Sequence, residues 1–381
     1  MSREPRRAAA RRVRGVLWGD TTAPTAYARI NAAWLRHLQG DPRLAVTSVR
    51  QAQELAALEP DFVVHHDYAT RFVDLQRPRT RRFIAVRTWD FGPYPPAWAA
   101  KIRADCDELW VHSRWTRAQA IASGIEADRV RIVPHGIDET LFRPDGPAHP
   151  LTTNRRFRFL FVGATVVRKG VDILLAAYDR AFGPRDDVCL VIKDHPGDVF
   201  YRGASLGNEI RARAADPQRP ALEYLDAHFT PARLAALYRA CDVAVFPYRA
   251  EGFCLPALEA LASGIPLIVP RFGACLDYAS SRNAFFVAAR HIVLPVQGRF
   301  AFNTLGFAED LAGVSFCEVD VDALVETLRV VAGTPATRRR RMGQAGARLA
   351  RSRFRWQDTI RRIRRFLRAG DPPRAAPWPP R

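Results

Sequence analysis

Residues 242–270 read DVAVFPYRAEGFCLPALEALASGIPLIVP and contain a complete strand–helix–strand pattern. The apolar run at 242–247 predicts a buried strand, and the run at 265–270 predicts another. Between them we expect a helix that begins at residues 255–256, Leu-Pro, because a proline in a first helical turn loses no hydrogen bond. Gly264 is a natural stop for that helix. Two successive strands joined by a helix are normally parallel, so this stretch predicts an α/β fold.

The same alternation extends to both sides of this stretch. Short apolar runs predict further strands, and apolar residues at helical spacing predict helices between them. The strand candidates are 13–18, 62–66, 83–89, 108–113, 129–138, 157–163, 188–194 and 221–226. A segment rich in Pro, Gly and Thr at 143–154 indicates a linker. The sequence therefore predicts two doubly wound, Rossmann-like domains facing a cleft, with ligands beyond the carboxyl ends of the strands.

Positive charge is concentrated at the two ends of the chain. The 381 residues include 58 Lys and Arg against 39 Asp and Glu, a net charge of +19. Residues 1–14 contribute +5 and residues 338–381 contribute +13, so the remainder is close to neutral. Such ends fit an anionic membrane surface or a solvated face rich in arginine. Nucleic acid fits less well, because no aromatic-rich basic stretch is present to stack on bases.

Near the C-terminus, residues 354–369 predict an amphipathic helix with arginines on its polar face. Its apolar face is formed by Trp356, Ile360, Ile363 and Leu367. Such a stripe suits docking on the protein body or lying on a membrane, and the sequence leaves both open. The Pro-rich tail 370–381 is expected to be disordered.

The cysteines and apolar runs indicate a cytoplasmic protein. None of the six cysteines belongs to a Cys-x-x-Cys pair, and Cys189 and Cys241 lie in apolar runs typical of buried thiols. The first apolar run, 15–18, is too short for a signal peptide, and no run of 18 apolar residues is present to span a membrane. A reducing cytoplasm is the expected compartment, and the basic ends leave peripheral contact with the inner membrane face open.

Two carboxylates flank the start of the helix predicted in the opening stretch. Glu251 precedes it and Glu259 lies about one turn into it. Unpaired backbone amides at a helix N-terminus bind hydroxyls, phosphate or other anionic oxygens. The amides expected here are those of Gly252, Phe253, Cys254 and Leu255. Acids near this end also stabilise a helix through its dipole, so their spacing alone does not decide the function.

Several segments, in the correct order, resemble retaining GT-B glycosyltransferases of family four, which transfer sugars from nucleotide sugars. The resemblance covers roughly residues 83–370. The family's E-x7-E segment is matched by EGFCLPALEALASGIPLIV (251–269), and its phosphate-binding strand and helix by FLFVGATVVRKGVDILLAAY (159–178). Its base-side helix and strand are matched by LAALYRACDVAVFPYRAEGF (234–253). Residues 108–144 are similar to the end of its acceptor domain and the linker, and FRWQDTIRRIRRFL (354–367) is similar to its closing helix.

The resemblance implies a GT-B architecture with two domains. The N-terminal acceptor-binding domain would span 1–147 and be completed by the helix 355–369, which crosses back to it. The nucleotide-sugar donor-binding domain would span 155–353.

Roles for individual residues follow from the same resemblance. Glu251, with the amides after it, would hold the hydroxyls of the transferred sugar, and Glu259 would bind the ribose. Lys169, helped by Arg168, would pair with the departing diphosphate. A fixed cation there stabilises the charge that grows as the glycosidic bond breaks.

The resemblance also assigns positions around the rest of the donor. Gly163 ends its strand and would let the diphosphate approach closely. Leu225 and Asp226 would lie near the base, and Gly19 would face the diphosphate from the first domain.

The chain departs from the family pattern at four places. Ala164 stands soon after the strand glycine, where many relatives have Arg, and Cys254 stands where Gly is commoner. The loop after residue 18 lacks the usual Gly-Gly, and Trp89-Asp90 replace a frequent His. Asp90 is therefore a candidate acceptor-side catalytic group, with a helix N-cap as the alternative.

We therefore predict metal-independent sugar transfer from a nucleoside diphosphate donor to a glycan, lipid-linked or small-molecule acceptor, and the resemblance implies that the configuration is retained. No cofactor beyond this substrate and no nucleic-acid partner are expected. The acidic pair at 320–322 is explained better by helix capping than by metal binding. The alternatives are a nucleotide-sugar epimerase or hydrolase on the same fold, and a non-catalytic GT-B-like binding protein. The absence of the post-strand arginine and the altered first-domain loop are the reasons for considering the last alternative.

Overall fold

A computed structural model describes residues 12–23, 25–67, 72, 74–195, 205–293 and 315–368. The predicted disordered tail 370–381 and most of the basic N-terminal segment lie outside these residues.

Two six-stranded sheets, each fully parallel, form the frame of the molecule. The first sheet has the order β2-β1-β3-β4-β5-β6, and the second has the order β12-β11-β10-β7-β8-β9. The strands of the first sheet are β1 (Val13–Trp18), β2 (Leu44–Val49), β3 (Phe62–His65), β4 (Arg82–Val86), β5 (Glu108–Val111) and β6 (Val130–Ile132). Those of the second are β7 (Phe157–Val162), β8 (Val188–Lys193), β9 (Ala221–Leu225), β10 (Val243–Val245), β11 (Leu267–Pro270) and β12 (Ala284–Val287).

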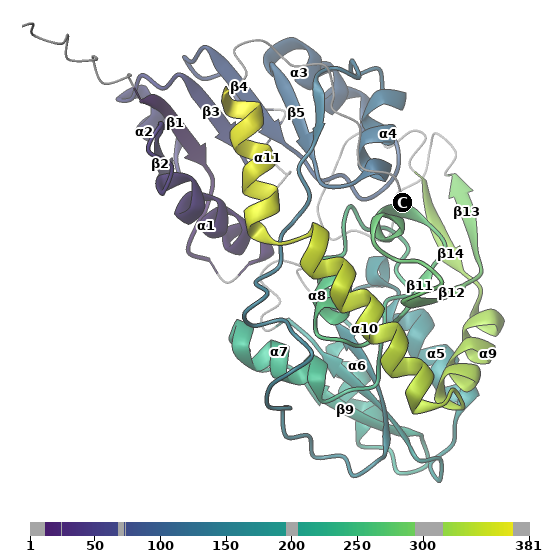
Figure 1. The fold of residues 1–381 in the computed structure, drawn as a ribbon. Coiled ribbons are helices and arrows are strands. Elements are labelled where there is room, and N and C mark those ends of the chain that lie inside the picture. Colours follow the sequence, from purple (N-terminus) through teal and green to yellow (C-terminus); the bar gives the residue numbers. More distant parts are fainter. Residues whose placement is uncertain are drawn as a thin grey trace, which may run out of the picture.

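Helices cover both faces of each sheet and create four apolar clusters, two for each sheet. The sheets with their helices form two lobes, the first above the second in Figure 1. The first lobe contains α1 (Ala26–Gln39), α2 (Ala52–Ala56), α3 (Pro96–Asp105) and α4 (Arg114–Ala122); the second contains α5 (Val171–Ala181), α6 (Gly207–Ala214), α7 (Pro231–Arg239), α8 (Leu255–Ala262), α9 (Val321–Ala332) and α10 (Ala336–Arg353). The predicted α/β architecture of two Rossmann-like sheets is confirmed.

The last helix, α11 (Trp356–Arg368), packs on the first lobe although it follows α10 of the second (Figure 1). Ile360, Ile363 and Leu367 are buried in the cluster that contains Trp34 and Trp110. The apolar stripe of this helix is therefore covered by protein, and the expectation that it could lie on a membrane is wrong for this stripe. Across the described residues, no helix is both long enough and apolar enough to cross a membrane.

The chain order creates a topological switch point in each sheet, where ligands of doubly wound folds bind. In the second sheet, β7 and β10 are neighbours while later strands run outward on both sides. In the first sheet, β1 and β3 have the same relationship. β13 (Ala289–Val293) and β14 (Ser315–Val319) form an antiparallel ribbon that follows the second sheet. This ribbon contacts the first lobe, because the amide of Ser315 donates to the carbonyl of Phe91.

Candidate active site

The central charge cluster lies where the loops after β7 and β10 meet. A 3-10 turn, η2 (Val167–Lys169), follows β7, and the segment that ends at Glu251 follows β10. The ammonium group of Lys169 contacts Glu251 Oε1, and Arg168 Nη1 lies 3.4 Å from the same oxygen. The structure thus brings together the three residues predicted to be catalytic, Glu251, Lys169 and Arg168, and all three are largely buried.

The cluster also joins the two lobes through Asp90, which follows β4. Its Oδ2 lies 3.0 Å from Arg168 Nη1, and its Oδ1 accepts a hydrogen bond of 2.7 Å from the amide of Gly252. Asp90 does not cap a helix of its own lobe, because α3 begins after Pro95, which has no side-chain cap. The alternative of a helix N-cap is therefore wrong, and Asp90 connects the two lobes instead.

The two carboxyl groups of the cluster have opposite pKa shifts. Burial would raise the pKa of Glu251, but the positive charges of Lys169 and Arg168 outweigh it and lower the pKa. Burial raises the pKa of Asp90, and Arg168 only partly offsets this effect. Glu251 is therefore the ionised partner of the two cations.

The turn that presents the two cations is fixed by its neighbours. Gly170 has φ +73°, and a Cβ there would lie 1.9 Å from the carbonyl oxygen of Pro247. Arg249, buried after β10, donates to the carbonyl of Val167 at 2.6 Å and pairs with Asp172 and Glu318. Arg249 was not predicted from the sequence, where it is one of many arginines.

Gly163 directly follows β7 and lies beside the side chain of Lys169. A Cβ on Gly163 would lie 3.2 Å from Lys169 Cδ, so the absence of a side chain leaves room for the lysine stem. Whether a diphosphate approaches here stays a prediction.

The N-terminus of α8 is only partly open. Cys254 precedes the helix with φ +60°, a left-handed conformation that glycine adopts more readily than residues with a side chain. The amides of Phe253, Cys254 and Leu255 have no hydrogen-bond acceptor among the described residues. The amide of Gly252 is already bonded to Asp90, so its prediction as a free donor is wrong for this structure. The ring of Phe253 packs in the core, which leaves only its backbone for a ligand.

Glu259 projects from α8 toward the first lobe. Its Oε1 accepts a bond of 2.8 Å from Arg29 Nη2 of α1, and its Oε2 accepts a bond of 3.2 Å from the hydroxyl of Tyr238. Burial, followed by the charge of Glu259, raises the pKa of Tyr238, so this hydroxyl stays protonated as a donor. Glu259 thus meets the first lobe at Arg29, while Arg168, the neighbour of Lys169, meets it at Asp90.

The positions predicted to lie near a base are at the ends of β8 and β9. Leu225 ends β9, and Asp226 after it pairs with Arg211 at a half-exposed position. Lys193, which the sequence analysis did not assign, ends β8 and lies over the ring of Phe229. Burial lowers the pKa of Lys193 to about 8.

In the first lobe, Gly19 follows β1 and lies against β3. A Cβ there would lie 2.2 Å from the carbonyl oxygen of His66, so close packing within this lobe explains the glycine. Its predicted contact with a diphosphate is untested.

Four buried histidines lie near the same strand ends and were not predicted as a group. His65 lies against Trp18, and His66, the next residue, lies against Asn31. The rings of His112 and His135 lie 3.9 Å apart, and Phe253 of the second lobe packs on His135. Within the described ranges, no group of three His, Cys, Asp or Glu has a geometry that could hold a metal ion.

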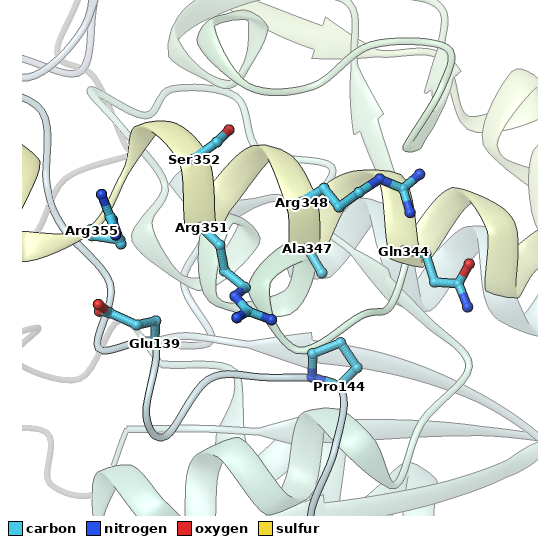
Figure 2. A pocket seen from close by; sticks show the side chains of 8 residues that line it. All are labelled: Glu139, Pro144, Gln344, Ala347, Arg348, Arg351, Ser352 and Arg355. Atoms are coloured by element: carbon cyan, nitrogen blue, oxygen red, sulfur yellow. The ribbon is translucent and has the colours of Figure 1, made fainter.

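A separate surface groove of about 680 Å³ lies between α10 and the segment that crosses between the lobes (Figure 2). It is lined by Glu139, Pro144, Gln344, Ala347, Arg348, Arg351, Ser352 and Arg355. None of the predicted site residues lines this groove. Its arginines, Arg348, Arg351 and Arg355, are part of the basic C-terminal segment.

Comparisons with known proteins identify glycosyltransferases as similar proteins. A model of family 4 glycosyltransferases in conflict systems matches residues 114–363. The D-inositol 3-phosphate glycosyltransferase of Acidothermus cellulolyticus is 31% identical over 194 residues, which cover 46% of this chain and 40% of that protein. The MMP alpha-(1->4)-mannosyltransferase of Mycolicibacterium hassiacum is 28% identical over 263 residues, which cover 62% of this chain and 60% of that protein. The chain therefore spans less than two thirds of either relative.

Solved structures confirm the predicted GT-B architecture. HepE of Anabaena, in complex with UDP and glucose, has a TM-score of 0.68 at 12% identity, covering 93% of this chain and 99% of that one. The trehalose 6-phosphate synthase of Burkholderia multivorans has a TM-score of 0.66 at 14% identity, covering 94% and 99%. At these identities the likeness shows the fold.

Proposed function

Because this chain belongs to the family 4 glycosyltransferases of conflict systems, we propose that it transfers a hexose from a nucleoside diphosphate sugar to an acceptor hydroxyl. One observation carries the proposal: Lys169 and Arg168 meet Glu251 at the switch point of the second sheet, beside the open amides of α8. Relatives whose names specify glycosyl transfer and a similar fold solved with UDP and glucose support the same donor class.

In this proposal, each part of the cluster acts on a different part of the donor. Lys169 and Arg168 neutralise the diphosphate as its charge grows, and the amides of Phe253, Cys254 and Leu255 add hydrogen bonds. Glu251, which stays ionised, accepts hydrogen bonds from the sugar hydroxyls. The network already aligns these groups before a donor arrives, which reduces the reorganisation that the reaction requires.

We propose that the configuration at the anomeric carbon is retained and that no metal takes part. The bond from the anomeric carbon to the diphosphate oxygen breaks, and the bond from the acceptor oxygen forms on the same face. The acceptor proton passes to the departing diphosphate. This route suits a cluster in which Glu251 is paired with two cations, because a carboxylate held in this way is a poor nucleophile.

The experiment compares Lys169→Met and Glu251→Gln with the wild-type chain. Binding of UDP, GDP, ADP and their glucose and mannose conjugates is measured by thermal shift, and transfer is measured with a panel of sugar phosphates and lipid-linked acceptors. We expect each variant to keep its fold and to lose about a hundredfold or more in turnover. Lys101→Met is the matched control, since Lys101 pairs with Asp105 on α3, away from the cluster.

Near-normal turnover in both variants would overturn the assignment. Release of free nucleotide without an acceptor would instead indicate a hydrolase, and binding without turnover across the panel would indicate a binding protein.

A further inference from the structure

The ion pair between Arg29 and Glu259 crosses the boundary between the lobes inside the proposed donor site. Arg29 belongs to α1 of the first lobe and Glu259 to α8 of the second, and Arg29 Nη2 lies 2.8 Å from Glu259 Oε1. The two side chains differ in burial: Arg29 is 42% exposed, whereas Glu259 is 3% exposed. Arg29 can therefore move into solvent-accessible space while Glu259 stays in place.

This pair competes with the role that the resemblance implies for Glu259. A ribose diol needs carboxylate oxygens as acceptors, and Oε1 already accepts a bond from Arg29 and Oε2 one from Tyr238, which leaves about half of the acceptor sites. A neutral hydroxyl does not displace a charge-assisted bond from an arginine without compensation. The compensation must come from a new partner for the arginine.

The arriving donor supplies such a partner. Two groups of ion pairs lie at the boundary between the lobes: Arg29 with Glu259, and Arg168 and Lys169 with Glu251 and Asp90. A bound nucleoside diphosphate adds negative charge next to the ribose, on the side where η2 presents its cations. Because the diphosphate is attached to the ribose, an arginine released by a ribose-binding Glu259 would be next to that added charge.

We propose that Arg29 is a donor-binding residue of the first lobe, which exchanges Glu259 for the diphosphate when a nucleotide sugar binds. This inference rests on the proposed function and extends it. The exchange frees Glu259 for the ribose and places a cation from the first lobe on the diphosphate. Binding of the diphosphate then draws the two lobes together, whereas binding of a nucleoside alone does not.

The exchange predicts effects of opposite sign for two classes of probe, measured by calorimetric titration. The probes are uridine, guanosine and adenosine, and the corresponding diphosphates. In Arg29→Gln, the nucleoside that suits the site should bind about threefold or more tightly, because Glu259 is free. Its diphosphate should bind about tenfold more weakly, because one cation is missing. Arg29→Lys, which keeps the charge, should restore most of the diphosphate affinity.

Arg36→Gln is the matched control, since Arg36 is exposed on the same helix and lies outside the cluster. A purely structural role for Arg29 would weaken both classes of probe together, and that result overturns the exchange. Unchanged affinities in Arg29→Gln, with wild-type binding abolished by Lys169→Met, overturn the exchange while leaving the proposed function intact. Absence of binding to any probe by the wild-type chain overturns both. If Arg29→Gln does not fold, Arg29→Met takes its place, and the same opposite shifts in nucleoside and diphosphate affinity decide the question.

Discussion

The carboxylate of Asp90 accepts a hydrogen bond of 2.7 Å from the amide of Gly252, which links the end of β4 in the first lobe to the segment before α8 in the second. The lobes approach closely here, because a Cβ on Gly252 would lie 2.2 Å from Thr88 Cγ2. The same carboxylate lies 3.0 Å from Arg168. Asp90 therefore positions both the amide of Gly252 and the guanidinium group of Arg168 at the proposed nucleotide-sugar site.

We expect Asp90→Asn and Asp90→Ala to separate this positioning role from proton transfer. An amide oxygen still accepts the bond from Gly252, so Asp90→Asn should lose about tenfold in kcat, whereas Asp90→Ala should lose about a hundredfold. The pH profile of kcat should keep its shape in Asp90→Asn. Equal inactivity of the two variants, together with loss of one limb of the profile, would instead show that Asp90 transfers a proton.

The turn that carries Arg168 and Lys169 should depend on Gly170. In Gly170→Ala, the added methyl group meets the Pro247 carbonyl at 1.9 Å in a left-handed conformation. We expect a loss of about 2 kcal/mol or more in unfolding free energy, measured by urea denaturation, and a parallel loss of donor affinity. Gly40→Ala is the control, because its Cβ would meet no atom closer than 3.7 Å and its φ is −75°. Equal stability of the two variants would contradict this reading of the turn.

Cys254 should reverse the usual order of alanine and glycine. Inside regular structure, glycine is less stable than alanine by about 0.5–1 kcal/mol, but a left-handed residue with a side chain costs about 1–2 kcal/mol. Since Cys254 has φ +60°, Cys254→Gly should be at least as stable as Cys254→Ala. Urea midpoints of the two variants test the order. A Cys254→Gly variant that is clearly the less stable would show that the backbone relaxes on substitution.

The strands that frame the site could be predicted from the sequence because they are short, apolar and separated by turn residues. The run at 157–163 corresponds to β7, and the run at 13–18 to β1. By contrast, β2 at Leu44–Val49 reads LAVTSV, with too little apolar contrast to be identified. The run at 129–138, expected to be a strand that ends in a Pro/Gly turn, contains the three residues of β6, and beyond the turn the amide of Ile137 donates to the carbonyl of Phe354.

Within the site, motifs could indicate Glu251, Lys169 and Arg168, which stand close to recognisable glycines and strands. Arg29 and Arg249 could not be found in this way, because the chain is rich in arginine and only the fold shows which arginines meet a carboxylate. The buried histidines likewise come from separate strands, so their proximity depends on the order of the sheet.

Those histidines should make stability depend on pH. Burial lowers the pKa of His112 to about 4 and lowers the pKa of His65, His66 and His135 well below the ordinary value. The unfolded chain takes up protons on these groups below about pH 6.5, whereas the folded chain does not. Unfolding therefore gains protons as the pH falls, and stability should decrease from pH 6.5 toward 4 by about 1.4 kcal/mol per pH unit for each histidine that stays neutral.

Urea midpoints at pH 7.5, 6.5 and 5.5 measure this slope in the wild-type chain and in His112→Asn. The asparagine amide can still donate to the Val133 carbonyl, the partner of His112 Nδ1 at 2.8 Å, so the fold should persist. We expect the dependence of the unfolding free energy on pH to decrease in His112→Asn by the equivalent of about one proton. The reason is that one fewer imidazole takes up a proton when the chain unfolds. His228→Asn, at an exposed position, is the control and should leave the slope unchanged. A slope that is the same in all three proteins would show that His112 takes up its proton within the folded chain, which contradicts the lowered pKa of this imidazole.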